Sequence, residues 1–239
     1  MTAHRAMTVP YDRQTLDTPN PIARFAHRAR FARSLAFIGG LPPGAAILDY
    51  GCGEGRFLSS IERRWPGKYR LMGYEPFMSR AFDGYSIVSG ADDVADESLH
   101  AMTCLEVCEH LDGDEVSELA RFARLKLRRD GMLVVSVPIM TGPVLALKEM
   151  NRCLLHRRVP EHSLGELFGS VFLGLRPSRA SNIKTSHKGY DYRETLVRLS
   201  GEFGLLRLDY SPFRPLPSLL NSQVFMVFHP KATDARPRG

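Results

Sequence analysis

Short apolar runs alternate with helical stretches between residues 45 and 138, and this alternation constrains the fold more than any other feature of the chain. The apolar runs are AAILDY, YRLMGYE, YSIVSG, AMTCLEV and MLVVSVPI. Helical spacing predicts helices near 56–64 and 114–127, and a short helix between 75 and 85. Strands that alternate with helices form parallel sheets with right-handed crossovers. The pattern therefore predicts an α/β fold, with a doubly wound, mostly parallel sheet and helices on both faces.

Composition changes divide the chain into five regions. The alternation stops after residue 138 and resumes with a helix near 192–203 and two strand candidates, LLRLDYS and QVFMVFHP. Insertions between late strands commonly recognise substrate, so we expect the intervening segment to form a lid. The predicted regions are 1–40 (an arm and an amphipathic helix), 41–138 (the sheet core), 139–187 (the insert), 188–231 (the last helix and strands) and 232–239 (a flexible tail).

Charge and cysteine content leave the partner class open. Thirty-two Lys and Arg against 26 Asp and Glu give a net charge of +6, which is too small and scattered to indicate nucleic acid by itself. Four cysteines without a CxxC pair favour reduced thiols over a disulfide scaffold. The N-terminus lacks the apolar core of a signal peptide, and no apolar stretch has the length of a membrane span. We therefore expect a cytoplasmic protein without a transmembrane segment, and the oligomeric state stays open.

A glycine-rich turn, DYGCGEGRF at residues 49–57, follows the first strand and leads directly into a helix. Glycines there allow the backbone to pass close to a ligand. A dinucleotide loop would read GxGxxG, but here the third glycine comes one residue early and Arg56 takes its place. No Lys-Ser or Lys-Thr follows, which excludes a P-loop. The turn therefore argues against binding of NAD or FAD, and it excludes binding of a nucleoside triphosphate by a P-loop.

The pattern DxGCGxGxF resembles motif I of the class I S-adenosylmethionine-dependent methyltransferases, and the likeness covers about residues 44–138 and recurs at the end of the sheet. The resemblance implies a Rossmann-like sheet with a late antiparallel strand. It also implies that Asp49 and the loop at Gly51, Cys52, Gly53 and Gly55 hold the methionine part of S-adenosylmethionine. That part carries an ammonium and a sulfonium, so an acidic residue suits it where a phosphate site would have none.

Further acidic positions follow in the order that this family shows. Glu75 ends the second strand, where its carboxylate can accept both ribose hydroxyls. Asp92 corresponds to the acidic position near the adenine amine, and the neighbouring Asp93 is a nearly equal candidate. Leu105, at the end of the fourth apolar run, is assigned to the same cofactor pocket.

The segment TCLEVCEHL at residues 103–111 contains an ExxEH box formed by Glu106, Glu109 and His110. It resembles the box of ubiquinone-pathway O-methyltransferases and of metal-dependent RNA-terminal ribose methyltransferases. If a helix starts here, the spacing puts the three side chains on one face. They would then hold Mg²⁺ or, with His110 as general base, accept a proton; a packing role without metal is the alternative. In the RNA group a histidine placed like His187 completes the metal set.

These features predict a methyltransferase that acts on oxygen, because the chain has no Asn-Pro-Pro-Tyr-like box and no marked active cysteine. The later segments resemble bacterial methyltransferases of glycan or lipid-linked building blocks. We therefore expect a small-molecule or glycan/lipid-linked hydroxyl as the acceptor, recognised by residues 139–187. One alternative is metal-dependent methylation of an RNA-terminal ribose. The second alternative is a non-catalytic regulator that binds S-adenosylmethionine.

Overall fold

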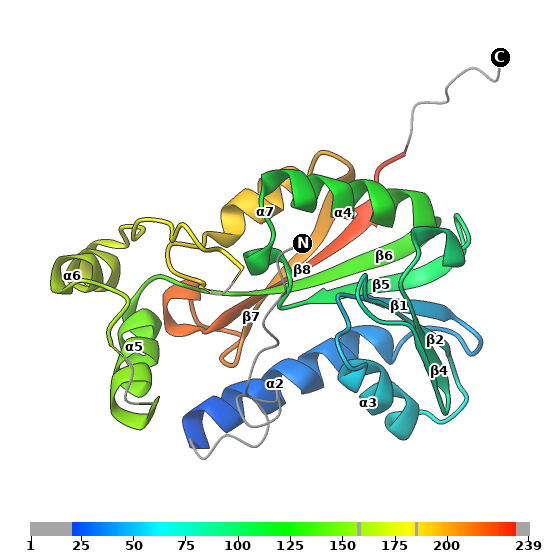
Figure 1. The fold of residues 1–239 in the computed structure, drawn as a ribbon, viewed down its shortest axis with the longest axis horizontal. Helices are drawn as coiled ribbons and strands as arrows, with labels where there is room; N and C mark the ends of the chain where they lie inside the picture. Colours follow the sequence, from blue (N-terminus) through cyan, green and yellow to red (C-terminus); the bar gives the residue numbers. More distant parts are fainter. Residues whose placement is uncertain (1–20, 157–158, 185, 233–239) are drawn as a thin grey trace.

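The computed structural model describes residues 21–156, 159–184 and 186–232 (Figure 1). Its centre is one eight-stranded sheet with the strand order β3-β4-β2-β1-β5-β6-β8-β7. Strands β4, β2, β1, β5 and β6 are parallel, whereas β8 runs antiparallel to β6 and β7. This confirms the mostly parallel sheet with a late antiparallel strand. The strands are β1 (Ala46–Tyr50), β2 (Arg70–Tyr74), β3 (Arg80–Phe82), β4 (Tyr85–Val88), β5 (Leu99–Leu105), β6 (Leu127–Pro138), β7 (Phe203–Ser211) and β8 (Gln223–Pro230).

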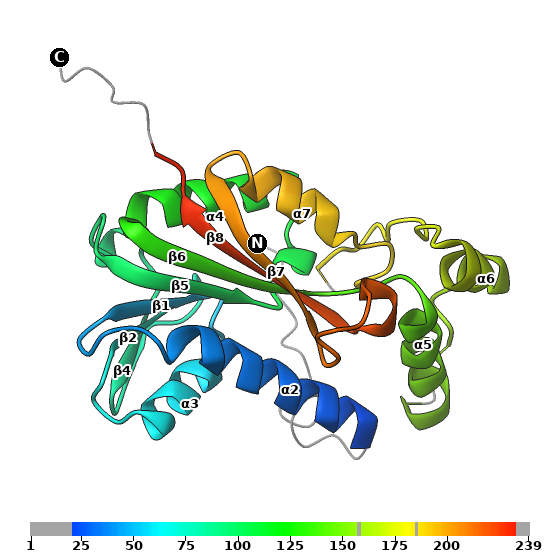
Figure 2. The ribbon, with the colours of Figure 1, turned by 180° about the vertical axis from the view of Figure 1, so that it is seen from behind.

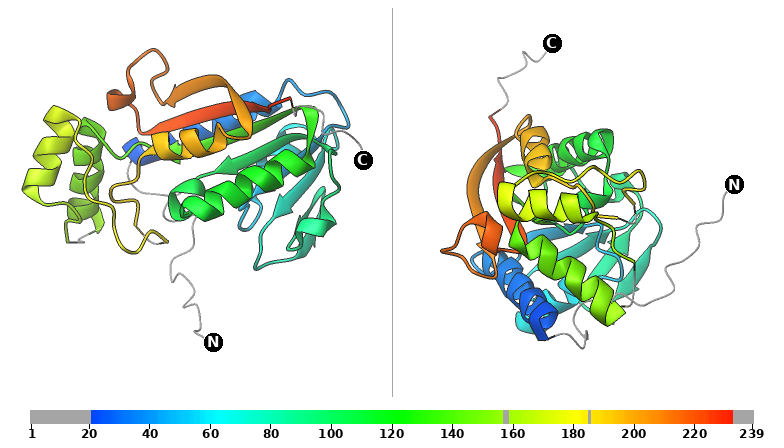
Figure 3. Two further views of the ribbon diagram at one scale, coloured as in Figure 1. Left: turned by 90° about the horizontal axis from the view of Figure 1, so that it is seen from above. Right: turned by 90° about the vertical axis from the view of Figure 1, so that its left-hand side faces the viewer.

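Helices cover both faces of the sheet, as the alternation predicts (Figures 1 and 2). Helices α2 (Pro21–Ile38) and α3 (Arg56–Arg64) lie on one face, and α4 (Gly113–Lys126) and α7 (Tyr192–Leu199) lie on the other. Helices α5 (Pro143–His156) and α6 (Leu164–Leu173) come from the insert. They extend beyond the end of the sheet, where β6 finishes (Figure 3).

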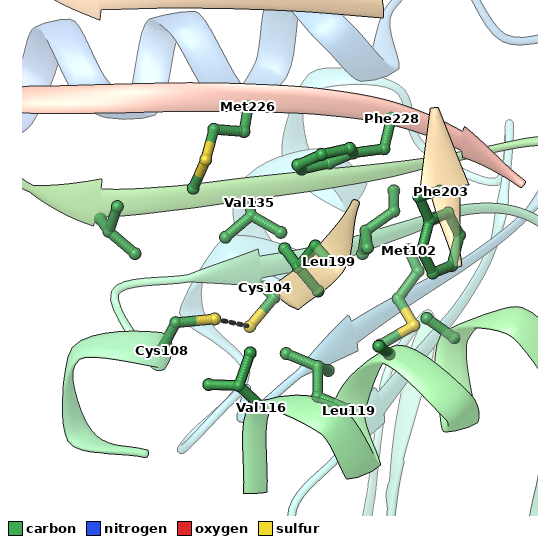
Figure 4. Packing of buried hydrophobic residues seen from close by; sticks show 14 of the residues in the cluster. Met102, Cys104, Cys108, Val116, Leu119, Val135, Leu199, Phe203, Met226 and Phe228 are labelled. Atoms are coloured by element: carbon green, nitrogen blue, oxygen red, sulfur yellow. Dashed lines mark hydrogen bonds between the residues drawn. The ribbon is translucent and has the colours of Figure 1, made fainter. Parts of the chain in front are cut away.

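The core has two main parts, one under each helical layer. The larger part packs side chains of β5, β6 and β8 against α4 and α7, and Figure 4 shows Met102, Val135, Leu119 and Leu199 within it. In the same cluster the thiols of Cys104 and Cys108 lie 3.7 Å apart, and all four cysteines of the chain are free. The second part packs α2 and α3 against β1 and β2. Burial on both faces explains why the central strands read as continuous apolar runs rather than as alternating ones.

The structure differs from the predicted elements in two places. The segment expected to form a short helix between residues 75 and 85 is instead β3, which pairs antiparallel with β4 across a turn at Asp83-Gly84. Asp-Gly is a typical hairpin turn, and the rings of Phe82 and Tyr85 stack with their centroids 4.7 Å apart across it. The late helix ends at Leu199 instead of Phe203, because Phe203 is buried as the first residue of β7.

The predicted arm at residues 1–20 and all but the first residue of the predicted tail lie outside the described residues. Within the described part of the chain, no helix has both the length and the apolar character needed to cross a bilayer.

Candidate active site

The glycine loop joins β1 to α3 in a conformation that only small residues allow. Gly51 has a φ of 68°, and a Cβ atom there would lie 2.7 Å from the Cγ2 of Val107. Gly55 precedes α3 with a φ of 74°, and a Cβ atom there would lie 2.6 Å from the Tyr85 ring. Both positions combine a left-handed backbone with a close approach, so any side chain would displace the turn. At Gly51 the loop backbone therefore runs against the carboxyl end of β5, where a ligand of a parallel sheet binds.

Asp49 lies at the end of β1 between two neighbouring strands, paired in register with Gly73 of β2 and Thr103 of β5. Its side chain is buried, and its Oδ1 accepts a hydrogen bond of 2.6 Å from the Thr103 hydroxyl. Burial raises the pKa of the Asp49 carboxyl to about 7, although the Thr103 hydrogen bond acts in the opposite direction. A cationic group placed beside this carboxyl would favour its ionised form. The site thus fits the ammonium of an amino-acid ligand.

Glu75 reaches from the end of β2 to the glycine loop, where one of its carboxylate oxygens accepts a hydrogen bond of 3.2 Å from the Gly53 amide. The amide of Gly51 donates to the carbonyl of Tyr74 at 2.8 Å, which closes the same corner. Cys52 lies beside them, and burial raises the pKa of its thiol to about 12. The Cys52 thiol is therefore a packing group and not a nucleophile.

The structure separates the two acidic candidates after β4. The carboxylate of Asp93 accepts a hydrogen bond of 3.1 Å from the Gly90 amide and so caps the short 3-10 helix η1 (Ala91–Asp93). Asp92 lies exposed beside it. This local role of Asp93 leaves Asp92 as the better placed of the two for a ligand. Leu105 is half-buried at the end of β5 and packs against the core under α3.

The ExxEH box forms no α-helix, and this changes which of its side chains converge. Glu106 has a φ of 59°, and only the single 3-10 turn η2 (Cys108–His110) follows. Glu106 turns toward α2, where its Oε2 lies 3.3 Å from Arg30 Nη1. Its Oε1 accepts a hydrogen bond of 3.0 Å from the Ser136 hydroxyl. Arg30 and Ser136 therefore hold Glu106 apart from the rest of the box.

Glu109, His110 and His187 do converge, and one ligand atom from each lies within 4.8 Å of the others. The Nε2 atoms of His110 and His187 are 3.1 Å apart, although the residues are 77 positions apart in the chain. His110 Nδ1 lies 3.4 Å from the carbonyl oxygen of Ile183. A carbonyl only accepts, so Nδ1 carries the proton and His110 Nε2 presents a lone pair to the cluster.

Burial shifts the pKa of each group in this cluster toward its uncharged form. The Glu109 side chain is fully buried, and neither carboxylate oxygen has a hydrogen-bond partner among the described residues. Burial, and secondly the charge of Glu106, raises the pKa of Glu109 well above its usual range. Burial lowers the pKa of His110 and lowers that of His187 to about 3. Two neutral imidazoles beside an unsatisfied buried carboxyl form a ligand set that a divalent cation would complete.

Arg179 contacts the cluster, and Lys148 and Arg30 lie near it; of these three, the sequence indicated only Lys148, as one of the basic residues of the insert. Lys148 on α5 donates a hydrogen bond of 2.9 Å to the Ile139 carbonyl, and burial lowers its pKa to about 8. Arg179 donates a hydrogen bond of 2.8 Å to the Glu109 carbonyl, and Arg30 pairs with Glu106 as described. None of the three belongs to a motif, so the sequence could not show that they lie near the cluster.

A doubly wound sheet, a glycine loop with no phosphate-binding lysine and a buried carboxylate beside it together define a fold and site of the S-adenosylmethionine-dependent methyltransferase class. Residues 22–170 match the methyltransferase domain family, and the chain belongs to that family. The protein is therefore a methyltransferase enzyme with S-adenosylmethionine as its cofactor, as the glycine loop predicted. No curated protein matches the chain in sequence.

Solved structures of methyltransferases share the fold. A TehB-like S-adenosylmethionine-dependent methyltransferase from Corynebacterium glutamicum superposes with a TM-score of 0.52 at 16% identity, over 92% of this chain and 94% of that one. A geranyl diphosphate methyltransferase superposes with a TM-score of 0.55 at 13% identity, over 87% of this chain and 80% of that one. The small RNA methyltransferase HEN1 superposes with a TM-score of 0.53 at 17% identity, over 88% of this chain but only 26% of that one. At these identities the likeness establishes the fold, and the acceptors of these proteins differ.

Proposed function

We propose that this methyltransferase transfers the methyl group to a hydroxyl oxygen of a small-molecule or glycan/lipid-linked acceptor. The observation that carries the proposal is the convergence of Glu109, His110 and His187, which follows β5 next to the glycine loop. A hydroxyl must lose its proton as it is methylated, and a base or a cation beside it assists that loss. The cofactor supplies a methyl group on a sulfonium that is ready to leave.

On the cofactor side, we assign Asp49 and the loop backbone at Gly51, Cys52, Gly53 and Gly55 to the methionine part. Glu75 would hold the ribose with the carboxylate oxygen that the Gly53 amide leaves available. Asp92 and Leu105 would border the adenine, while Asp93 supports Asp92 through the cap at Gly90. These groups align the donor and exclude water, which is most of what an in-line displacement requires from a protein.

On the acceptor side, the cluster can act in two ways. In the first, His110 Nε2 accepts the hydroxyl proton, because the Ile183 carbonyl holds the proton of the ring on Nδ1. In the second, Glu109, His110 and His187 hold a divalent cation that polarises the hydroxyl. With Glu106 bound to Arg30, the set has two imidazoles and one carboxylate. Such a set suits Mn²⁺, Fe²⁺ or Zn²⁺ better than the Mg²⁺ that an all-oxygen site prefers.

Metal titration and variants distinguish these two roles. We expect Glu109→Gln and His110→Ala to reduce turnover by at least tenfold and to leave S-adenosylhomocysteine affinity within about threefold. If a chelator abolishes turnover and Mn²⁺ or Zn²⁺ restores it, the cation role holds; if a chelator has no effect, the base role of His110 holds. Wild-type turnover in both variants would contradict both roles. Val197→Ala, on the exposed side of α7, is a matched control.

We also propose that residues 139–187 recognise the acceptor. This insert supplies His187 and Arg179, which contact the cluster, and Lys148, whose charge acts on Glu109 and His187. Lys148 and Arg179 are cationic and would suit an acceptor that carries an anionic group. Replacing residues 159–175, which include α6 but none of these three, with a short Gly-Ser linker should preserve cofactor affinity and abolish transfer to the native acceptor. Native turnover in the shortened protein would place recognition elsewhere.

Methyl transfer from tritiated S-adenosylmethionine decides the acceptor class. Separate lipid, small-molecule and RNA fractions of a cell extract are incubated with the enzyme, and the labelled bond is tested with alkali, which ethers survive and esters do not. We expect an alkali-stable label in the lipid or small-molecule fraction. A label confined to the 2′-oxygen of RNA ends would instead establish the RNA reaction, for which the three-residue cluster and the shared HEN1 fold are the supporting observations.

A further inference from the structure

Exposed hydrophobic side chains gather at one end of the molecule. Of the eighteen exposed large hydrophobics that the structure describes, thirteen lie in α5, in and beside α6, in the β7–β8 connection, and at Phe25 of α2. We call this surface the apolar end. Monomeric proteins rarely expose so many apolar side chains in one region unless the region meets a partner or a membrane.

Helix α6 gives the apolar end its most pronounced stripe. Leu164, Phe168 and Phe172 recur every fourth residue and are 87%, 60% and 71% exposed. The rings of Phe168 and Phe172 lie 4.9 Å apart, so they form one continuous surface. The only charged residue of the helix, Glu166, is bound to Lys188 at 2.9 Å. The helix thus directs its charge toward the protein and its apolar side outward.

The β7–β8 connection extends this surface along α5. Leu216, Leu219 and Leu220 are each about two-fifths exposed. A Cβ atom on Gly142 would lie 2.8 Å from Leu219, which shows how closely this connection approaches the start of α5. Helices α5 and α6 lie beyond the end of the sheet, where β6 finishes (Figure 3). The apolar end is therefore on the same side of the sheet as the cluster of Glu109, His110 and His187, which follows β5.

The same segments carry most of the excess positive charge of the chain. Residues 21–30, 143–175 and 212–222 contain eight Lys and Arg and three acidic residues, a sequence net charge of +5 out of +6. Two of these cations are inside the protein, because Arg30 is buried against Glu106 and Lys148 is buried, whereas Arg28 and Arg214 are exposed. The carboxylates of Glu149 and Glu166 are engaged within the protein, because Glu149 binds His162 at 3.2 Å and Glu166 binds Lys188. An apolar surface that carries exposed cations such as Arg28 and Arg214 is complementary to an amphiphile with anionic head groups.

We propose that the apolar end docks on the surface of an anionic phospholipid bilayer. The α6 stripe and the leucines of the β7–β8 connection enter the head-group region, and the exposed Arg28 and Arg214 contact lipid phosphates. A second copy of the chain fits less well, since a two-fold interface would bring these like charges together. Nucleic acid also fits less well, because nine of the thirteen side chains are aliphatic and offer no ring for base stacking.

This docking would present the active site to an acceptor that resides in the bilayer. Docking therefore favours a lipid-linked acceptor over a soluble one, and this choice of acceptor rests on the proposed function. Docking itself is independent of the proposed function, because it requires neither the cofactor nor methyl transfer.

Vesicle sedimentation tests the proposal with the full chain. The probes are vesicles of pure phosphatidylcholine and vesicles with about 30% phosphatidylglycerol. We expect binding to the anionic vesicles that weakens at least tenfold between 0.1 and 0.5 M NaCl. The double substitution Phe168→Ser and Phe172→Ser should lower the partition coefficient at least tenfold. Val197→Ser, which is 71% exposed on α7, is the matched control and should bind like wild type. Calorimetry with S-adenosylhomocysteine verifies that each variant is folded.

Three results would overturn docking: no binding to anionic vesicles, equal binding by the double variant, or equal binding to both vesicle types. A dimer in sedimentation velocity that the double variant loses would assign the surface to a second copy. Loss of RNA binding in that variant, without vesicle binding, would assign it to nucleic acid. If vesicles bind but the lipid fraction of an extract accepts no label, docking stands and the lipid-linked acceptor is refuted.

Discussion

Binding of the cofactor should release a proton from Asp49, and the structure sets the size of this effect. Burial places the pKa of Asp49 at about 7 instead of 3.8. At about 1.36 kcal/mol per pKa unit, ionising this carboxyl in the free protein costs about 4 kcal/mol more than in the unfolded chain. An ammonium beside the carboxyl offsets that cost. If binding lowers the pKa below about 5, we expect about 0.9 proton to be released at pH 6 and about half a proton at pH 7.

The corresponding affinity change can be measured directly. S-adenosylhomocysteine, which carries the same ammonium, should bind about eightfold more weakly at pH 6 than at pH 7.5. Calorimetry at pH 6 in two buffers of different ionisation enthalpy gives the number of protons released. Asp49→Asn should bind more weakly and release none. Thr103→Val removes the hydroxyl that donates to Asp49 at 2.6 Å, so it should raise the pKa further and move the transition to higher pH.

The same ionisation affects folding, with a definite sign. A carboxyl whose pKa is higher in the folded than in the unfolded state favours folding only while it is protonated. The free enzyme should therefore lose stability relative to Asp49→Asn as the pH rises from about 4 to 7, and the two proteins should converge below pH 4. Constant affinity between pH 6 and 7.5, or the same proton release in Asp49→Asn, would refute a buried protonated Asp49 next to the cofactor ammonium.

Three further predictions concern the loop and the box. Glu75→Ala should weaken S-adenosylhomocysteine binding by about 1.5–3 kcal/mol in calorimetry, and unchanged affinity would remove Glu75 from the site. Gly51→Ala should abolish that binding and lower the melting temperature, whereas adding Val107→Ala, which removes the methyl groups 2.7 Å away, should restore part of both; no restoration would refute the clash. Arg30→Met should destabilise the fold by about 3 kcal/mol in urea unfolding, because it leaves the largely buried Glu106 carboxylate without its cation; a loss below about 0.5 kcal/mol would show that this pair is not important.

Much of the fold was predictable because its signals are local. The central strands are buried on both faces and so appear as uninterrupted apolar runs, and turn residues separate them from helices. The Asp49–Gly55 turn was also legible, since its glycines adopt conformations that other residues avoid. The hairpin of β3 was missed although Asp83-Gly84 is a local turn signal. In that case the expectation of continued alternation outweighed the turn chemistry.

The composition of the active site depended on tertiary structure. The ExxEH spacing could not show that Glu106 adopts a left-handed backbone and pairs with Arg30, 76 residues away on another helix. Likewise, His187 meets His110 only because the insert returns across the end of the sheet. The pKa shifts of Asp49 and of the cluster follow from burial, which depends on all surrounding elements at once. The sequence by itself thus determined the sheet, the glycine loop and the class of enzyme, whereas packing decided which side chains meet and which charges they carry.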